Sequence, residues 1–107
     1  MKGPDELEAI IATSEFQAVL IHINQIDFDQ STPLENELTT LLEPTNIGYH
    51  DGNEIGWGET TLWLFGADAE EVFKYVEPAL RKNSFCKGAR VVLRFGEFAS
   101  PEREFFL

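Results

Sequence analysis

The segment Phe16–Ile23, FQAVLIHI, constrains the fold of this chain more than any other stretch. Its residues are apolar on both alternating registers, and several are β-branched. A strand with one wet face alternates between apolar and polar residues, whereas a strand covered on both faces does not. The segment therefore predicts a central strand near residues 16–23.

The segment TPLENELTTLLEP carries a helix signal. Thr32 is the predicted N-cap, Pro33 takes the first helical position, and Glu35 follows three residues after the cap. Pro44 follows the expected end, so the helix is predicted over residues 33–43. Its apolar stripe consists of Leu34, Leu38, Leu41 and Leu42.

The segment DAEEVFKYVEPALRKN repeats these features, with Asp68 as the cap and Glu71 completing a capping box. A helix is expected over residues 69–82. Pro78 predicts a kink or an early end, because proline lacks a backbone donor and clashes with the preceding turn. The apolar stripe consists of Ala69, Val72, Phe73, Val76 and Leu80.

Three further strands are expected near residues 48–55, 59–66 and 89–95. Gly56 and Gly58 are expected to supply the positive φ angles of a tight hairpin between the first two. The order of elements predicts an α+β, ferredoxin-like βαββαβ sandwich, with two helices on one face of a four-stranded antiparallel sheet. The final EREFFL is expected to add a short edge strand or to dock as a tail.

The chain of 107 residues predicts one domain, residues 1–107, and its charge is unusual. Eight basic residues oppose 19 acidic ones, a net charge of −11. Residues 1–71 hold 15 acidic residues and one basic one, whereas residues 72–107 hold four and seven. This field disfavours nucleic acid and anionic membrane, would attract a basic protein, and also keeps a small protein soluble.

The absence of a long apolar run and of a signal-peptide pattern predicts a cytoplasmic protein that does not enter a membrane. The lone Cys86 excludes a disulfide framework. Either it packs as a small apolar residue, or Lys82 and Lys87 lower its pKa and make it reactive.

The segment Tyr49–Glu59, YHDGNEIGWGE, admits two interpretations. Asp51, Glu54 and Glu59, with His50, offer the groups of a carboxylate site. However, the spacing fits no calcium loop or dinucleotide fingerprint, so no metal, cofactor or catalytic residue is predicted. The other interpretation is a hairpin, in which Trp57 at the tip either folds back or waits for a partner.

Strand alternation also predicts an apolar face that no helix covers. If Leu62, Leu64, Val91 and Leu93 face the helices, the residues that alternate with them lie on the opposite face of the sheet. These are Trp63, Phe65, Arg90, Val92 and Arg94. Such a face needs a cover, which the N-terminal segment, the tail Phe105–Leu107, a second copy or a ligand would provide, and a homodimer is predicted in preference to the tail.

The second half of the chain contains three short motifs in order, GxExGxGE, GxDAxxxF and RFG. Their defining residues are Gly52, Glu54, Gly56, Gly58, Glu59, Gly66, Asp68, Ala69, Phe73, Arg94 and Gly96. Over its last 60 or so residues the chain thereby resembles a group of small, acidic, uncharacterised bacterial proteins. The resemblance implies no particular activity.

Two function classes follow from these observations. The first is a non-enzymatic binding or regulatory module, immunity- or inhibitor-like, acting through the open face or the acidic surface. Its candidate patch consists of Glu54, Trp57, Glu59, Trp63, Phe65, Arg90 and Arg94. The second is a small hydrolase or transferase with the carboxylate site at Asp51, Glu54 and Glu59.

Overall fold

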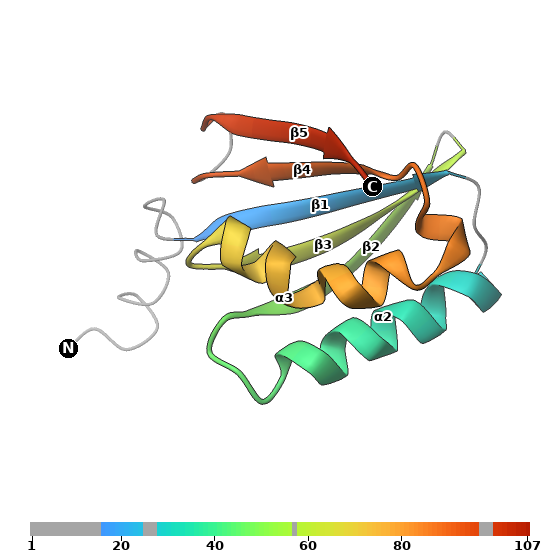
Figure 1. Cartoon of the computed structure of the whole chain (residues 1–107), viewed down its shortest axis with the longest axis horizontal. Coiled ribbons are helices and arrows are strands. Elements are labelled where there is room, and N and C mark those ends of the chain that lie inside the picture. The colour runs from blue at the N-terminus through green and yellow to red at the C-terminus, as the bar shows by residue number, and fades with distance from the viewer. Residues whose placement is uncertain (1–15, 25–27, 57, 97–99) are drawn as a thin grey trace.

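The computed structural model describes residues 16–24, 28–56, 58–96 and 100–107. Their elements, in chain order, are β1 (Gln17–Asn24), α2 (Phe28–Leu42), β2 (Gly48–Gly56), β3 (Glu59–Gly66), α3 (Ala69–Arg81), a 3₁₀ turn (Ser84–Cys86), β4 (Arg90–Arg94) and β5 (Glu102–Phe106). Figure 1 shows α2 and α3 lying side by side against one face of the sheet. The fold class is therefore α+β, with two helices packed on an antiparallel sheet.

The sheet has five strands, in the order β2-β3-β1-β4-β5, and every neighbouring pair is antiparallel. The expectation of four strands is wrong. The tail residues Glu102–Phe106 pair with β4 and extend the sheet sideways, so the tail forms an edge strand and does not lie over the open face. The predicted central strand is confirmed, because β1 pairs with β3 on one side and with β4 on the other.

The hydrophobic core lies between the sheet and the two helices. Alternate residues of β1, β3 and β4 point into it, together with the apolar stripes of both helices. Burying one such aliphatic side chain contributes about 1.5–3 kcal/mol. Its largest fully buried members include Val19, Ile21, Ile23, Leu34, Leu38, Leu42, Leu62, Leu64, Val72, Val76, Leu80 and Leu93.

Helix α2 begins at Phe28, so the prediction of Thr32 as its N-cap is wrong. Pro33 lies inside the helix, and Glu35 is buried against β2 instead of serving a capping box. The additional turn places Ser31, which is fully buried, on the same side as Leu34. Burial in the tertiary structure thus overrides the local capping signal.

Helix α3 begins as predicted. The Asp68 carboxylate accepts hydrogen bonds from the backbone N–H groups of Glu70 and Glu71, at 3.0 and 3.3 Å. Of the two alternatives at Pro78, the early end does not occur, because the helix continues to Arg81, close to the predicted end at residue 82.

The segment YHDGNEIGWGE is a hairpin, with an irregularity in the pairing between His50 and Asn53. Gly52 lies at this bulge with φ 90°, and Gly58 in the turn has φ 75°, whereas Gly56 does not have the expected positive φ and ends β2. Glycine tolerates such φ angles at no steric cost.

The neighbouring residues Phe105 and Phe106 on β5 allow a matched test of this fold. The ring of Phe105 packs edge-on against that of Phe73 at a centroid distance of 4.9 Å, whereas Phe106 is 63% exposed. We expect Phe105→Ala to lower the free energy of unfolding by about 2–3 kcal/mol, and Phe106→Ala by less than about 0.5 kcal/mol. Urea unfolding measures both, and equal losses would contradict the docking of β5 against α3.

Candidate functional site

The face of the sheet opposite the helices is the candidate site, and the strand register aligns its residues in rows. Trp63 and Val92 both lie opposite Leu20, and Phe65 and Arg94 both lie opposite Ala18. A third row contains Thr61, His22 and Arg90. None of these residues belongs to the core between sheet and helices. We call this surface the open face.

One end of the open face carries four aromatic rings in sequential contact, here named the aromatic strip. Phe16 meets Tyr49 edge-on at 6.4 Å, and Tyr49 meets Phe65 at 5.7 Å. Phe65 stacks on Trp63 at 6.0 Å, and the Arg94 guanidinium lies 5.9 Å from the Trp63 ring centre. Tyr49 is 44% exposed, so the strip reaches solvent. Burial, and next the nearby charge of Asp51, raise the pKa of Tyr49.

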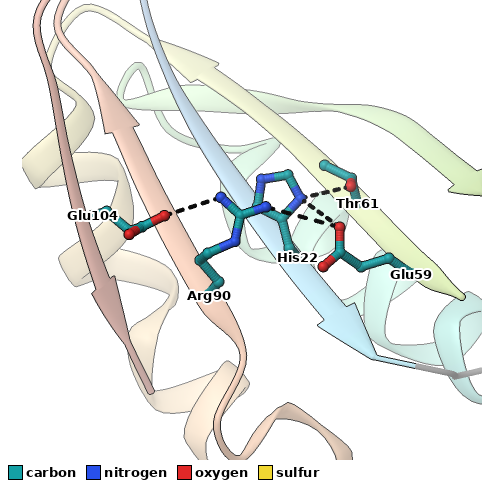
Figure 2. Close-up of polar contacts among 5 residues, drawn as sticks. All are labelled: His22, Glu59, Thr61, Arg90 and Glu104. Atoms are coloured by element: carbon teal, nitrogen blue, oxygen red, sulfur yellow. Dashed lines mark hydrogen bonds and ion pairs between the residues drawn. The ribbon is translucent and has the colours of Figure 1, made fainter. Parts of the chain in front are cut away.

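The other end of the open face carries a polar cluster of His22, Glu59, Thr61, Arg90 and Glu104, shown in Figure 2. The Nδ1 atom of His22 lies 2.8 Å from the Thr61 hydroxyl oxygen and 3.4 Å from a Glu59 carboxylate oxygen. Arg90 donates to Glu104 at 3.0 Å, and lies 3.9 Å from Glu59. The predicted residues Glu59 and Arg90 are thus brought together with three that sequence reasoning did not select.

The polar cluster lacks the arrangement of a nucleophilic triad. A catalytic histidine uses one ring nitrogen for the nucleophile and the other for the orienting carboxylate. In this cluster, Thr61 and Glu59 both approach the same Nδ1 atom of His22. Burial, and next the charge of Arg90, lower the pKa of His22 below 6.5, so the imidazole is neutral at pH 7.

A cavity of about 340 Å³ adjoins the polar cluster. It is lined by Glu54, Ile55, Gly56, Glu59 and Thr61. Two of the three predicted carboxylates therefore share one concave surface. The third, Asp51, is not among the lining residues and lies near Tyr49 instead.

His50 lies on the opposite side of β2, in a network that joins this strand to α2. Its Nδ1 atom is 3.0 Å from the Thr39 hydroxyl, and its Nε2 atom is 3.0 Å from Glu35, outside hydrogen-bond geometry. The amide of Asn53 donates to the other Glu35 oxygen at 2.7 Å. These contacts join α2 to β2 on the side of the strand that faces the helices.

The remaining predicted residues have simpler outcomes. Cys86 is buried, and burial raises its pKa to about 11, which favours the packing interpretation over a reactive thiol. Trp57 lies outside the described residues. Within the described ranges, no three His, Cys, Asp or Glu side chains are grouped so as to hold a metal ion.

Comparisons with protein families, curated proteins and solved structures find no match to this chain. The resemblance to small acidic bacterial proteins therefore stays a prediction. Neither helix in the described part of the chain has the length and apolar character that a membrane crossing requires.

Thr39 and Thr40 provide a matched test of the network between α2 and β2. Both are exposed on α2, and only Thr39 contacts His50. Thr39→Ala should lower the free energy of unfolding by about 1 kcal/mol more than Thr40→Ala, because it removes one hydrogen bond. Equal effects of the two substitutions in urea unfolding would show that the network does not stabilise the fold.

The lowered pKa of His22 predicts how stability depends on pH. Below about pH 6.5 the unfolded chain binds a proton at His22 that the folded protein does not, so the free energy of unfolding falls as pH decreases towards the folded pKa. His22→Gln should reduce this loss between pH 7.5 and 5.5. Urea unfolding at both pH values checks it, and an unchanged loss would contradict the assignment.

Proposed function

We propose that the protein is a non-enzymatic binding module whose open face holds a basic protein partner. The observation that carries this proposal is the aromatic strip, which reaches solvent at Tyr49 and is flanked by carboxylates. An exposed aromatic surface of this kind is typical of an interaction site. Tyrosine and tryptophan are also enriched among the residues that dominate protein interfaces.

The charges around the strip favour a cationic partner. At the strip, Asp51 acts on Tyr49 and Glu102 lies opposite Arg94, and at the polar end Glu54 lies opposite Thr61. None of these three carboxylates forms an ion pair with the described residues. Lysine and arginine side chains gain about 0.5–2 kcal/mol over an aromatic face. The net charge of −11 would also speed the approach of a basic protein.

A second copy of the chain fits the open face less well. Two copies face to face would bring together two sets of carboxylates, Asp51, Glu54 and Glu102, that have no ion pair among the described residues, with Arg94, likewise without one, on each face. Like charges across an interface oppose association. We therefore favour a basic protein over a second copy of the chain as the occupant of the open face. In this proposal the chain acts on its partner as an immunity or inhibitor protein would.

The enzyme alternative rests on the cavity between Glu54 and Glu59. A carboxylate site needs an acid and a base in different environments, or a nucleophile beside a base. His50, the predicted base, lies on the other side of β2, and Asp51 does not line the cavity. These placements make binding the better-supported function.

The proposal extends to the fold family. The order β2-β3-β1-β4, with a helix between β1 and β2 and another between β3 and β4, agrees with a ferredoxin-like sandwich. We propose that β5 is an edge strand added to this plan. The strand moves the free edge of the sheet away from β4 and leaves the open face accessible.

Tyr49 and Tyr75 give a matched test of the proposed function. They are 44% and 40% exposed, but Tyr75 is on α3, away from the open face. Immobilised wild-type protein, Tyr49→Ala and Tyr75→Ala are compared in capture from native lysate, and captured proteins are then purified for affinity measurement. We expect a basic protein that Tyr75→Ala retains and that binds Tyr49→Ala at least about tenfold more weakly, a loss of about 1.4 kcal/mol.

Two results would contradict the proposal. One is a captured protein that binds both tyrosine variants equally. The other is a partner that is acidic and whose binding does not weaken with added salt, because exposed charge pairs are screened by salt.

A further inference from the structure

Arg94 is the one arginine of the chain without a carboxylate partner within ion-pair distance among the described residues. The chain has four arginines. Arg81 pairs with Glu77, Arg90 with Glu59 and Glu104, and Arg103 with Glu70. The Nε atom of Arg94 is buried and makes no hydrogen bond.

Arg94 lies on the open face, beside the aromatic strip. The strand register places it opposite Ala18, on the open face, and its guanidinium lies over the ring of Trp63. Contact with a ring face orients a guanidinium but accepts no hydrogen bond from the Nε–H edge. A buried donor without an acceptor is unfavourable, and a guanidinium fork binds a carboxylate with two parallel hydrogen bonds.

Among the described residues, Glu102 is the carboxylate that the strand register places beside Arg94. The pairing of β4 with β5 places it directly opposite Arg94, yet the two side chains are not within ion-pair distance. Glu102 is exposed at the edge strand, whereas the Nε atom of Arg94 is buried. Within the part of the chain that the structure describes, no carboxylate pairs with the Arg94 guanidinium, and the residue is partly exposed although its Nε atom is buried.

We propose that Arg94 is a carboxylate-binding subsite of the open face, and that one Asp or Glu side chain of the protein partner binds there. The inference rests on the proposed function, which supplies the basic protein partner, and it adds a requirement on the charge pattern of that partner's surface. The partner's surface is cationic where it meets Asp51, Glu54 and Glu102, and it carries one carboxylate beside apolar groups. That single inverted charge fixes how the partner lies on the strip, because any other orientation places a cation on Arg94.

The subsite can be tested with a small probe that does not require the partner. 2-Naphthylacetate has an aromatic body for the strip and a carboxylate for Arg94, whereas 2-naphthylacetamide has the same body without the charge. Each is titrated into the full chain while the Arg94 Nε–H resonance is followed by ¹H–¹⁵N NMR. We expect a saturable shift of this resonance with the acid, and at least tenfold weaker binding of the amide.

Matched variants complete the test. Arg94→Gln should weaken binding of the acid at least tenfold, whereas Arg81→Gln, on helix α3 away from the open face, should leave it within about twofold. The proposal is wrong if the Arg94 resonance does not move, or if the two variants behave alike. It is also wrong if the acid binds only to Glu102→Gln, because Glu102 would then be the natural partner of Arg94.

The two proposals fail separately. If the Arg94 resonance does not shift but capture still depends on Tyr49, the carboxylate subsite is wrong and the binding module stands. If the Arg94 resonance shifts but no captured protein depends on Tyr49, the open face has an anion site and the basic protein partner is wrong.

Discussion

The backbone pairing of β1 on both of its edges is the constraint on which the rest of the structure depends. Because β3 and β4 both bond to this strand, its side chains are committed alternately to two layers. Val19, Ile21 and Ile23 enter the helix-covered core, whereas Leu20 and His22 lie on the open face. A shift of one residue in the pairing would exchange the two layers, so the core and the candidate site are fixed by the same register.

This shared register explains why the open face has two chemically different ends. Along β3, the open-face positions change from Thr61 to Trp63 and Phe65, and along β4 from Arg90 to Arg94. The polar end satisfies most of its own charges, since Arg90 contacts two carboxylates. At the aromatic end, Arg94 has no ion pair among the residues that the structure describes, and we propose that this asymmetry directs the partner to the strip.

The fifth strand joins the C-terminal end of the chain to the sheet and to helix α3. Two of its three charged residues form ion pairs with neighbouring elements, Arg103 with Glu70 of α3 and Glu104 with Arg90 of β4. Exposed ion pairs of this kind contribute little stability each. Most of the stabilisation from β5 therefore comes from backbone pairing and from the contact of Phe105 with Phe73. The two ion pairs of β5 involve two of the seven basic residues in the C-terminal third of the chain.

The sequence by itself determined the features that depend on local pattern. The apolar registers of β1, the capping by Asp68, the two helical stripes and the hairpin around Gly58 are all encoded by residues close to one another in the chain. Alternation also placed Trp63 and Arg94 on the face without helices, because side chains on a strand point to opposite faces in turn.

Only the tertiary structure decided the features that depend on distant partners. Helix α2 begins one turn before the cap that the sequence predicts, and Glu35 meets His50 and Asn53 because α2 packs along β2. Likewise, Glu59 reaches His22 across neighbouring strands, whereas His50 is turned to the opposite layer from Glu54. Local sequence specifies which way a side chain points, but the groups that it meets depend on strand register and helix packing, which bring together residues far apart in the chain.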